Sequence, residues 1–414
     1  MNGFYIAWRN LITKPLRFFF NILLIAIAAG LITITLLIDI QFKDHFEKNL
    51  DDVDLILCAK GSPLQTVLCN LFHIDAPTGN IDLKEARVFL NPEHPIIKAA
   101  IPLALGDQFN GYRIVGTTLE YFPWFNLELN SGAYFKKDLD AVIGSAVAKE
   151  LKLALGSEFL SGHGLVTDGD MTHSHDQQFQ VTGILKQTGG VLDRLIFVSI
   201  SSYWAMHPVE DEEGHPAHTQ DIPCIDNRSL KDKEGQITSV LLSFKGTNIQ
   251  SLNFGRSINE NTGMMAANPA IELNRLYELT GSASELVTIL AILLTLLATL
   301  SLFISIWQAM EERKFEIAVL RLGGASFNKI LFWILLEGFI LSSIGLLIGI
   351  FFAHILLTVL SSSLELQIKY GIEGLVFVKE EFLLFGIGIG LGLVSCLIPA
   401  IKVIRRDIHQ TLSS

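Results

Sequence analysis

Between two long apolar runs, the chain reads Met310-Glu-Glu-Arg-Lys-Phe-Glu-Ile-Ala-Val-Leu-Arg-Leu-Gly-Gly-Ala325. Its charged residues are Glu311, Glu312, Arg313, Lys314, Glu316 and Arg321. Phe315, Val319 and Leu322 recur at helical spacing, which predicts a short amphipathic helix at a membrane surface. Two glycines end the pattern, as glycine commonly does just past a helix. A charged helix that joins two membrane spans can be gripped by a soluble partner, so the pattern indicates a membrane subunit coupled to another protein.

Four apolar windows are long enough to cross a bilayer, which needs about 20 residues. They are Phe18–Ile38, Leu286–Trp307, Ile330–Leu360 and Phe382–Ile404. Half of the 414 residues are apolar, which exceeds the usage of an ordinary soluble protein of this length. No small-residue cleavage site follows the first window, so we expect a retained span rather than a signal peptide.

Basic residues predict the orientation of these spans, because cytoplasmic loops are rich in Lys and Arg. The basic segments contain Arg9, Lys14 and Arg17, then Arg313, Lys314, Arg321 and Lys329, then Lys402, Arg405 and Arg406. We therefore expect both termini and the charged helix in the cytoplasm. The segment between the first two spans then faces outward.

That outward segment, residues 41–281, holds 19 Lys and Arg against 31 Asp and Glu, a net charge of −12. Such an acidic surface excludes nucleic-acid binding. Strand-like runs alternate with helical pieces, which predicts an α+β domain. The strand-like runs are Val53–Cys58, Tyr112–Thr117, Ala141–Gly144, Phe179–Leu185, Leu195–Ile200 and Thr238–Phe244, and the helical pieces are Ser145–Leu153 and Ile271–Leu279.

The sequence thus predicts an α+β membrane protein with four transmembrane helices and a large α+β domain between the first and second. The expected parts are an interfacial N-terminal helix (1–17), a first span (18–40), an outer domain with stalk helices (41–280) and a C-terminal membrane domain (281–414). Within the last part, we expect spans at about 286–308, 330–360 and 382–404, and the charged helix at about 310–324.

Three cysteines fall in the outer segment, where an oxidising compartment permits disulfides. Cys58 and Cys69 could pair and leave Cys224 over, but three cysteines leave the pairing open. Glu337 and His354 are ionisable residues inside the third span, where charge is costly. We expect Glu337 to tie helices together rather than to move protons, and His354 to be a hydrogen-bonding packing residue.

Six of the eleven histidines lie between residues 163 and 218, interleaved with Asp and Glu. They are His163, His173, His175, His207, His215 and His218. Imidazole and carboxylate are ligands that Zn²⁺ accepts, so a weak or regulatory metal site is one interpretation. The other interpretation is a solvated acidic loop with incidental histidines, since no spacing matches a closed structural site or a metalloprotease helix. No cofactor is required by either.

No Gly-x-x-x-x-Gly-Lys-Ser/Thr phosphate loop is present, so the chain carries no recognisable ATP site of its own. Residues 312–324, Glu-Arg-Lys-Phe-Glu-Ile-Ala-Val-Leu-Arg-Leu-Gly-Gly, closely resemble the coupling-helix signature of the MacB, LolC and FtsX type of permease, the type VII ABC transporters. Residues 7–11, Ala-Trp-Arg-Asn-Leu, are similar to the motif before their first span. Glu337-Gly338, Gly345, Gly349 and Pro399-Ala400 resemble their third and fourth spans.

The resemblance implies a non-catalytic permease subunit that couples a separate cytoplasmic ABC ATPase to movement of the periplasmic domain. It also implies a place in the bacterial inner membrane in contact with lipid, and a homodimer or pseudo-symmetric pair. In many relatives it implies a periplasmic or outer-membrane partner as well. The residues that carry the coupling signature are Glu312, Arg313, Glu316, Leu320, Arg321 and Gly323. Residues 59–65, 73–80 and 188–194 look like a narrower, zinc-responsive subgroup of Gram-negative bacteria. A zinc or metallophore transport component and a membrane-anchored metalloenzyme are the alternatives.

Overall fold

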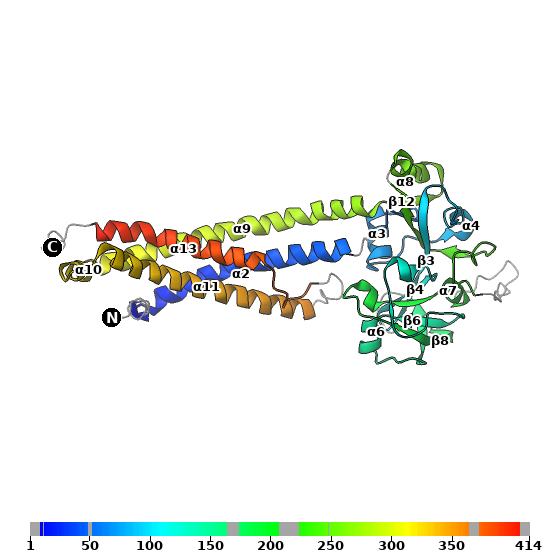
Figure 1. The fold of residues 1–414 in the computed structure, drawn as a ribbon, viewed down its shortest axis with the longest axis horizontal. Helices are drawn as coiled ribbons and strands as arrows, with labels where there is room; N and C mark the ends of the chain where they lie inside the picture. The colour runs from blue at the N-terminus through cyan, green and yellow to red at the C-terminus, as the bar shows by residue number, and fades with distance from the viewer. Residues whose placement is uncertain are drawn as a thin grey trace. The chain divides into compact units, whose positions relative to one another are not determined.

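The computed structural model describes residues 9–10, 12–48, 52–163, 174–206, 223–246, 248–363 and 372–405. The chain divides into two compact units (Figure 1). Residues 1–43 and 279–414 form a helical unit, and Asp44–Glu278 form a unit built on a β-sheet, here called the sheet unit. The expected class, four apolar helices with an α+β domain between the first and second, is confirmed.

The helical unit contains four helices that are long and apolar enough to cross a membrane. They are α2 (Pro15–Lys48), α9 (Pro269–Glu312), α11 (Phe327–Ser363) and α13 (Glu380–Ile404), and the short α10 (Lys314–Leu322) lies between α9 and α11. The four long helices lie side by side in Figure 1. Their outer faces remain apolar and exposed, as in Leu296 and Phe351, which suits contact with lipid.

Glycines allow the closest approaches between these helices. A Cβ atom on Gly349 would lie 2.4 Å from the carbonyl oxygen of Ala26 in α2, and one on Gly392 would lie 1.8 Å from Ser342 Oγ in α11. Only some glycines of α13 lie at such a crossing. A Cβ atom on Gly386 or Gly390 would have no neighbouring atom within 4 Å. Small residues at these crossings therefore fix the packing of α11 against α2 and α13.

The sheet unit contains twelve described strands and several short helices. The strands are β1 (Leu55–Ala59), β2 (Ile81–Asp82), β3 (Ile97–Phe109), β4 (Tyr112–Thr117), β5 (Leu129–Gly132), β6 (Asp140–Ile143), β7 (Glu158–His163), β8 (Ser174–Leu185), β9 (Ile196–Ser199), β10 (Gln236–Ile237), β11 (Ser239–Phe244) and β12 (Met264–Ala267). The helices are α3 (Pro63–Leu71), α4 (Leu83–Ala86), α5 (Tyr121–Trp124), α6 (Ser145–Glu150), η1 (Val191–Arg194), α7 (Ile200–Met206) and α8 (Ile249–Asn261).

Ten of these strands form one sheet in the order β12-β1-β11-β3-β4-β9-β6-β8-β5, with β7 paired to β3 and β8. The pairs β4–β9 and β6–β8 are parallel, and the other described pairs are antiparallel. Two apolar cores result. One gathers around β1 and β11 with Leu57 and Val240, and the other around β4, β6 and β9 with Ile114 and Ile196.

Strand β3 joins the two halves of the sheet. Its first part pairs with β11, and its pairing with β4 begins at Ala104. Pro102, which has no N–H to donate, lies before that point. The Thr117 hydroxyl donates to the Pro102 carbonyl at 3.0 Å. The proline is tolerated because it falls where β3 changes its partner.

All four cysteines are free and buried. Cys58 Sγ lies 3.1 Å from Thr66 Oγ1, and Cys69 Sγ lies 3.4 Å from Arg113 Nη1. The Cys58–Cys69 disulfide, which the sequence left open, is not formed in this structure. Each of these two thiols instead contacts a polar side chain.

Candidate coupling site

The charged helix between the second and third spans is shorter than the sequence predicted. Helix α9 continues through Met310 to Glu312, and α10 begins at Lys314. Arg313 separates them with non-helical angles, φ −99° and ψ 9°. The expected helix at about 310–324 is therefore the end of one helix, a one-residue break, and a nine-residue helix. The break turns α10 away from the axis of α9 (Figure 1).

The end of α10 is a Schellman motif. Gly324 N–H donates to the Arg321 carbonyl at 3.1 Å, and Ala325 N–H donates to the Leu320 carbonyl at 3.0 Å. Gly324 has a φ of +88°, in the left-handed region that favours glycine, whereas Gly323 has a φ of −74°. The glycine that the backbone requires is thus Gly324, while the family signature had drawn attention to Gly323.

Two faces of α10 have different environments. Ile317 and Ala318 are buried, and Ile317 belongs to the apolar cluster that Ile330 and Val403 also join. On the other side lies a surface of exposed apolar and charged residues, here called the α10 surface: Phe315, Glu316, Val319, Leu320 and Leu322. Phe315 is 56% exposed and Leu322 is 64% exposed. One face of α10 therefore packs against the spans, and the other is exposed in the described part of this chain.

Glu312, the last residue of α9, faces the start of α2. Its carboxylate bonds the Lys14 ammonium, and Arg17 Nη2 lies 2.9 Å from its Oε1 atom. The Glu312 side chain is 42% exposed, so each pair contributes little free energy by itself. Two cations on one carboxylate nevertheless fix the position of the α9 end against α2.

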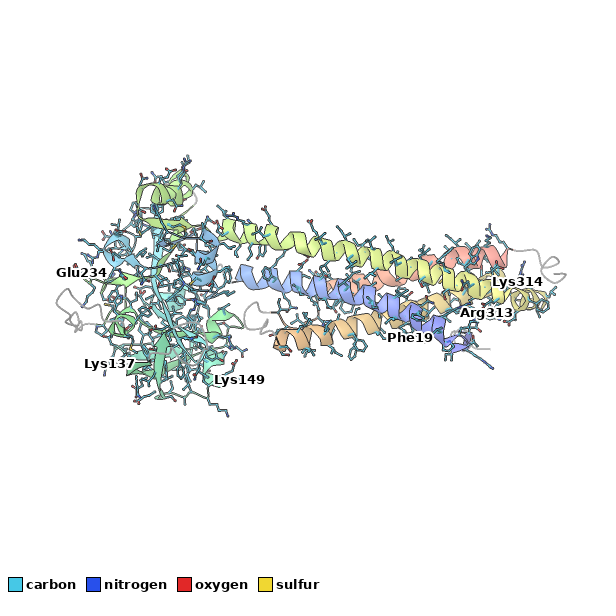
Figure 2. All side chains as sticks on the ribbon, turned by 180° about the vertical axis from the view of Figure 1, so that it is seen from behind. Phe19, Lys137, Lys149, Glu234, Arg313 and Lys314 are labelled. Carbon is cyan, nitrogen blue, oxygen red and sulfur yellow. The ribbon has the colours of Figure 1, made fainter. Side chains whose placement is uncertain are left out.

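Arg313 lies between α9 and α10 (Figure 2) and contacts two further segments, α11 and the residues before α2. Its Nη1 atom lies 3.0 Å from Glu337 Oε1 in α11, and its Nη2 atom donates to the Asn10 carbonyl at 3.2 Å. Asn10 Nδ2 donates to the same Glu337 oxygen at 2.7 Å. Glu337 is 3% exposed, so its charge is balanced inside the protein rather than by water.

These groups line a polar cavity of about 460 Å³ within the helical unit. Three cationic side chains, Lys14, Arg17 and Arg313, and three anionic side chains, Glu312, Glu316 and Glu337, contribute to its wall. Opposite charges in equal number make the cavity a network of mutual contacts rather than a site for a strongly charged ligand. The polar contacts of Glu312, Arg313 and Glu337 connect the helices around the cavity, and this group of contacts is here called the joint.

The structure places four of the six predicted coupling residues in two settings, and Glu316 belongs to both because it also lines the cavity. Glu316 and Leu320 lie on the α10 surface, whereas Glu312 and Arg313 bond to α2, Asn10 and α11. Sequence reasoning missed Asn10, Lys14 and Arg17 as members of this network. Asn10 lies within the family motif at residues 7–11, which was the one signal that could have found it.

Most of the histidines considered for zinc lie outside the described residues. His173, His207, His215 and His218 fall in residues 164–173 and 207–222, and of His163 and His175 only the backbone is described, in β7 and β8. The β7–β8 hairpin corrects one expectation, since residues 161–163 and 174–178 are strand rather than loop. In the part of the chain that the structure describes, no three metal-ligating side chains come together. Zinc binding stays a prediction.

A second buried polar cluster lies in the sheet unit, far in sequence from α10. Arg113 is 7% exposed, and its Nη2 atom donates to the Asp75 carbonyl. Burial, and to a smaller extent the Arg113 charge, lower the pKa of His73 to about 3. Neither His73 ring nitrogen has a hydrogen-bond partner. Burial raises the pKa of the Cys69 thiol, so this thiol stays protonated.

Comparison with family models identifies two domains in the chain. Residues 18–228 match the MacB-like periplasmic core domain, and residues 288–408 match the FtsX-like permease C-terminal domain. The chain is also similar to two solved structures. The periplasmic region of MacB from Actinobacillus actinomycetemcomitans is 11% identical with a TM-score of 0.33, over 56% of this chain and 97% of that chain. The extracellular domain of the ABC-type transporter YknZ from Gram-positive bacteria is 14% identical with a TM-score of 0.29, over 52% and 99%.

No curated protein matches the chain significantly. The two domain matches therefore carry the assignment. The first alone covers more than half of the 414 residues, and the second covers α11, α13 and most of the apolar part of α9. The chain belongs to the MacB/FtsX-type ABC transporter permeases.

Proposed function

We propose that this permease transmits motion, so that closure of an ATPase at α10 displaces the periplasmic domain without a channel for substrate through the bilayer. Permeases of this type are multi-pass inner-membrane proteins and work with a cytoplasmic ATPase. The finer mechanism, in which α10 receives the force, is our proposal.

The two-faced environment of α10 is the observation that carries the proposal. The α10 surface offers an aromatic side chain, Phe315, beside a charged one, Glu316, and both are exposed. Aromatic anchors bordered by charge are common in protein–protein contacts. The opposite face is held by Ile317 and Ala318, so a force applied to the surface reaches the spans.

The polar contacts around Glu337 connect α10 to more than one long helix, so a force on α10 can displace several of them. Arg313 connects α10 to α11, and Glu312 connects the end of α9 to α2. Helix α2 continues to Lys48 and α9 begins at Pro269, so each runs without a helix break past the boundary between the two units, at residues 43–44 and 278–279. Continuous helices bend little over a few turns, which favours the transmission of displacement.

The proposal includes an orientation and an assembly. Both termini and α10 lie in the cytoplasm, as the positive-inside rule predicts from Arg9, Arg321 and Lys402. Two copies form a homodimer with separate ATPase subunits, and a periplasmic or outer-membrane partner joins the sheet unit. Among the alternatives, a zinc-related cargo depends on histidines outside the described residues, so it stays open.

The α10 surface can be tested with the chain in detergent or nanodiscs, together with the ABC ATPase co-expressed with it. Phe315→Ala and Glu316→Lys should each weaken co-purification of the ATPase. We expect Phe315→Ala to reduce the affinity by roughly tenfold, since truncation of an interfacial aromatic anchor commonly costs more than 1 kcal/mol. Permease-stimulated ATP hydrolysis should fall in parallel.

Phe351→Ala is the matched control, because Phe351 is 61% exposed on α11 and lies within a span. It removes the same side chain at similar exposure and should leave the ATPase contact unchanged. Full ATPase association in the Phe315→Ala and Glu316→Lys variants would show that α10 is not the contact.

A further inference from the structure

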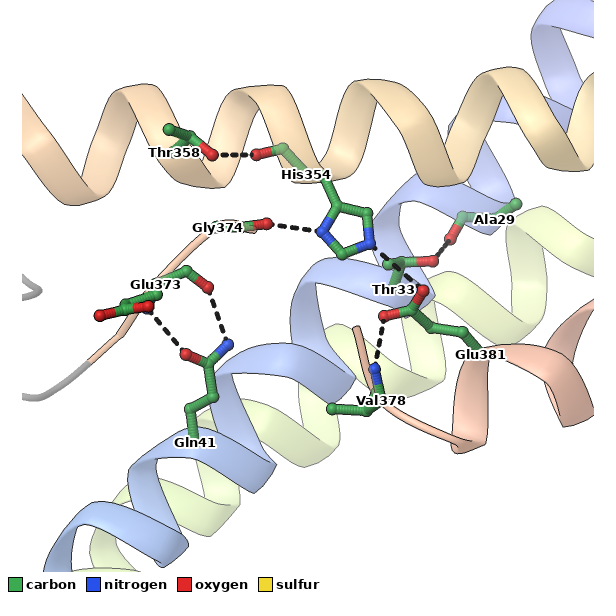
Figure 3. Close-up of polar contacts among 9 residues, drawn as sticks. All are labelled: Ala29, Thr33, Gln41, His354, Thr358, Glu373, Gly374, Val378 and Glu381. Carbon is green, nitrogen blue, oxygen red and sulfur yellow. Dashed lines mark hydrogen bonds and ion pairs between the residues drawn. The ribbon is translucent and has the colours of Figure 1, made fainter. Parts of the chain in front are cut away.

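A short segment between the third and fourth long helices is fastened to three helices (Figure 3). The described part of this segment, residues 372–379, is here called the 372–379 segment. The Gln41 side chain in α2 bonds both backbone groups of Glu373, at 3.0 Å and 2.7 Å. Ser361 in α11 donates its hydroxyl to the Ile372 carbonyl at 2.5 Å. The segment is therefore part of the helical packing rather than a free connection.

The third fastening is a pair of buried titratable side chains. His354 in α11 places Nδ1 2.5 Å from the Gly374 carbonyl oxygen and Nε2 3.2 Å from Glu381 Oε2 in α13. The two side chains are 5% and 8% exposed. Phe377 covers the imidazole, with ring centroids 4.4 Å apart. Water is thus largely kept away from both groups.

Hydrogen-bond chemistry fixes the number of protons in this pair. A carbonyl oxygen can only accept, so His354 Nδ1 carries a hydrogen. In a neutral imidazole the other nitrogen, Nε2, is then an acceptor. Glu381 Oε2, if ionised, is an acceptor as well. Two facing lone pairs inside a buried pocket repel each other, so the observed contact requires one proton between Nε2 and Oε2.

The other Glu381 oxygen adds to the fastening. Val378 N–H donates to Oε1 at 3.3 Å, so Glu381 holds the segment and the imidazole together. Among the described residues, the charged side chains near this end of the helices include Asp39 in α2, Glu373 and Lys379 in the segment, and Glu380 in α13. Asp39 accepts from Ser284 in α9 at 2.8 Å, and Lys379 lies 3.9 Å from Glu380.

We infer that His354 and Glu381 form a binding site for a single proton, and that this proton locks the 372–379 segment against α11 and α13. With the proton bound, Nε2 and Oε2 share one hydrogen bond and the segment is closed. When the proton leaves to water on the side of the membrane where the segment lies, the neutral imidazole and the carboxylate repel each other. The segment then separates from His354.

Site-directed labelling of the full chain in nanodiscs tests this. Ile372 is 4% exposed and packs with Leu37 and Leu357, so Ile372→Cys reports opening in a background without the four native cysteines. Leu375→Cys, at a position that is 71% exposed, corrects for the pH dependence of the thiol itself. The corrected Ile372→Cys labelling rate should rise with pH, by up to about tenfold per pH unit, as expected for an equilibrium linked to one proton.

Three variants separate the proton site from simple packing. Glu381→Gln keeps the shape of the side chain and can donate an amide hydrogen to Nε2, so it should label slowly at every pH. His354→Ala removes the site and should label fast at every pH. Glu380→Gln is the matched control, one residue away on the same helix, and should follow the unaltered chain. A pH-independent rate in the unaltered chain would overturn the inference, as would a Glu381→Gln chain that labels fast or titrates like the unaltered one.

Discussion

The Arg313 guanidinium, at the turn that joins α9 to α10, lies 3.0 Å from the Glu337 carboxylate in α11. Their exposures differ, since the Arg313 side chain is 20% exposed and the Glu337 side chain is 4% exposed. Removal of Glu337 and removal of Arg313 therefore leave the remaining charge in two different environments. A lone Arg313 can turn toward water along its flexible stem, whereas a lone Glu337 stays enclosed among the helices.

The two single variants should consequently differ in stability. We expect Arg313→Met to lower the stability of the folded chain by roughly 1–3 kcal/mol more than Glu337→Gln, because the first leaves a buried carboxylate without its cation. Thermal unfolding in a fixed detergent at neutral pH measures the difference. The double variant should recover part of the loss. Equal effects of the two single variants would contradict this asymmetry, and additive effects in the double variant would show that the ion pair does not stabilise the joint.

The Schellman motif predicts unequal roles for two adjacent glycines. Gly324→Ala should destabilise the end of α10 by about 1 kcal/mol, because an L-residue with a side chain is strained at a φ of +88°. Gly323→Ala should be nearly neutral, since its Cβ would lie 3.5 Å from the nearest atom, an ordinary contact. Stimulation of the ATPase and thermal unfolding, measured on both variants, test this. A larger effect at Gly323 would contradict the assignment of the cap.

The ring nitrogens of His73, which are enclosed in the sheet unit, predict a loss of stability in acid. The pKa of His73 is about 3 in the folded chain, against about 6.5 for an exposed histidine in the unfolded chain. Between these two pKa values only the unfolded chain binds the proton. The contribution of His73 to the free energy of unfolding is therefore complete above about pH 6.5 and declines as the pH falls toward about 3. Urea unfolding of the sheet unit within the full chain, measured across this range, should show the slope.

His73→Asn is the variant that isolates this effect. His73 has a φ of +53°, and asparagine tolerates the left-handed region better than most residues. The variant should reduce the dependence of the urea midpoint on pH while leaving the midpoint at neutral pH close to that of the unaltered chain. An unchanged acid slope would place the acid sensitivity elsewhere.

Labelling from one side of the membrane tests the orientation. Lys149 in the sheet unit and Lys314 at the start of α10 are both exposed (Figure 2). In a background without native cysteines, Lys149→Cys should react with an impermeant thiol reagent added to spheroplasts, and Lys314→Cys should react only after permeabilisation. Lys137→Cys, also exposed in the sheet unit, is a second outward control. Reaction of Lys314→Cys in intact spheroplasts would reverse the predicted topology.

The four long helices were predicted well because an apolar run of about 20 residues rarely forms anything other than a membrane-spanning helix. Tyr112–Thr117 was predicted as a strand and is β4, since its apolar and β-branched residues stand between clear turns. β3 was missed because Pro102 and Gly106 interrupt its pattern, and their tolerance depends on the change of partner described above. Local sequence cannot show which strand lies alongside.

The same limit applies to the coupling site. The pattern predicted Phe315, Val319 and Leu322 as one apolar face of α10, and the structure leaves that face exposed while it buries Ile317 and Ala318. The joint needs Asn10 to meet Glu337 across more than 300 residues of chain. The break at Arg313 also has no sequence signal, because neither Gly nor Pro is present there. Only the packing of α2, α9 and α11 shows why the arginine leaves the helix. Its guanidinium reaches both partners from that position.

The pairing of β1 has a consequence for synthesis. Leu55, close behind the first span, pairs with Leu242, and Ile56 pairs with Ala267, just before α9 begins. In the proposed orientation, almost the whole domain must therefore cross the membrane before β1 gains either neighbour. Until then, the apolar strand β1 has both of its hydrogen-bonding edges unpaired, and such edges promote aggregation. This permease should depend on periplasmic chaperones during its translocation more than a protein whose first strands form a hairpin.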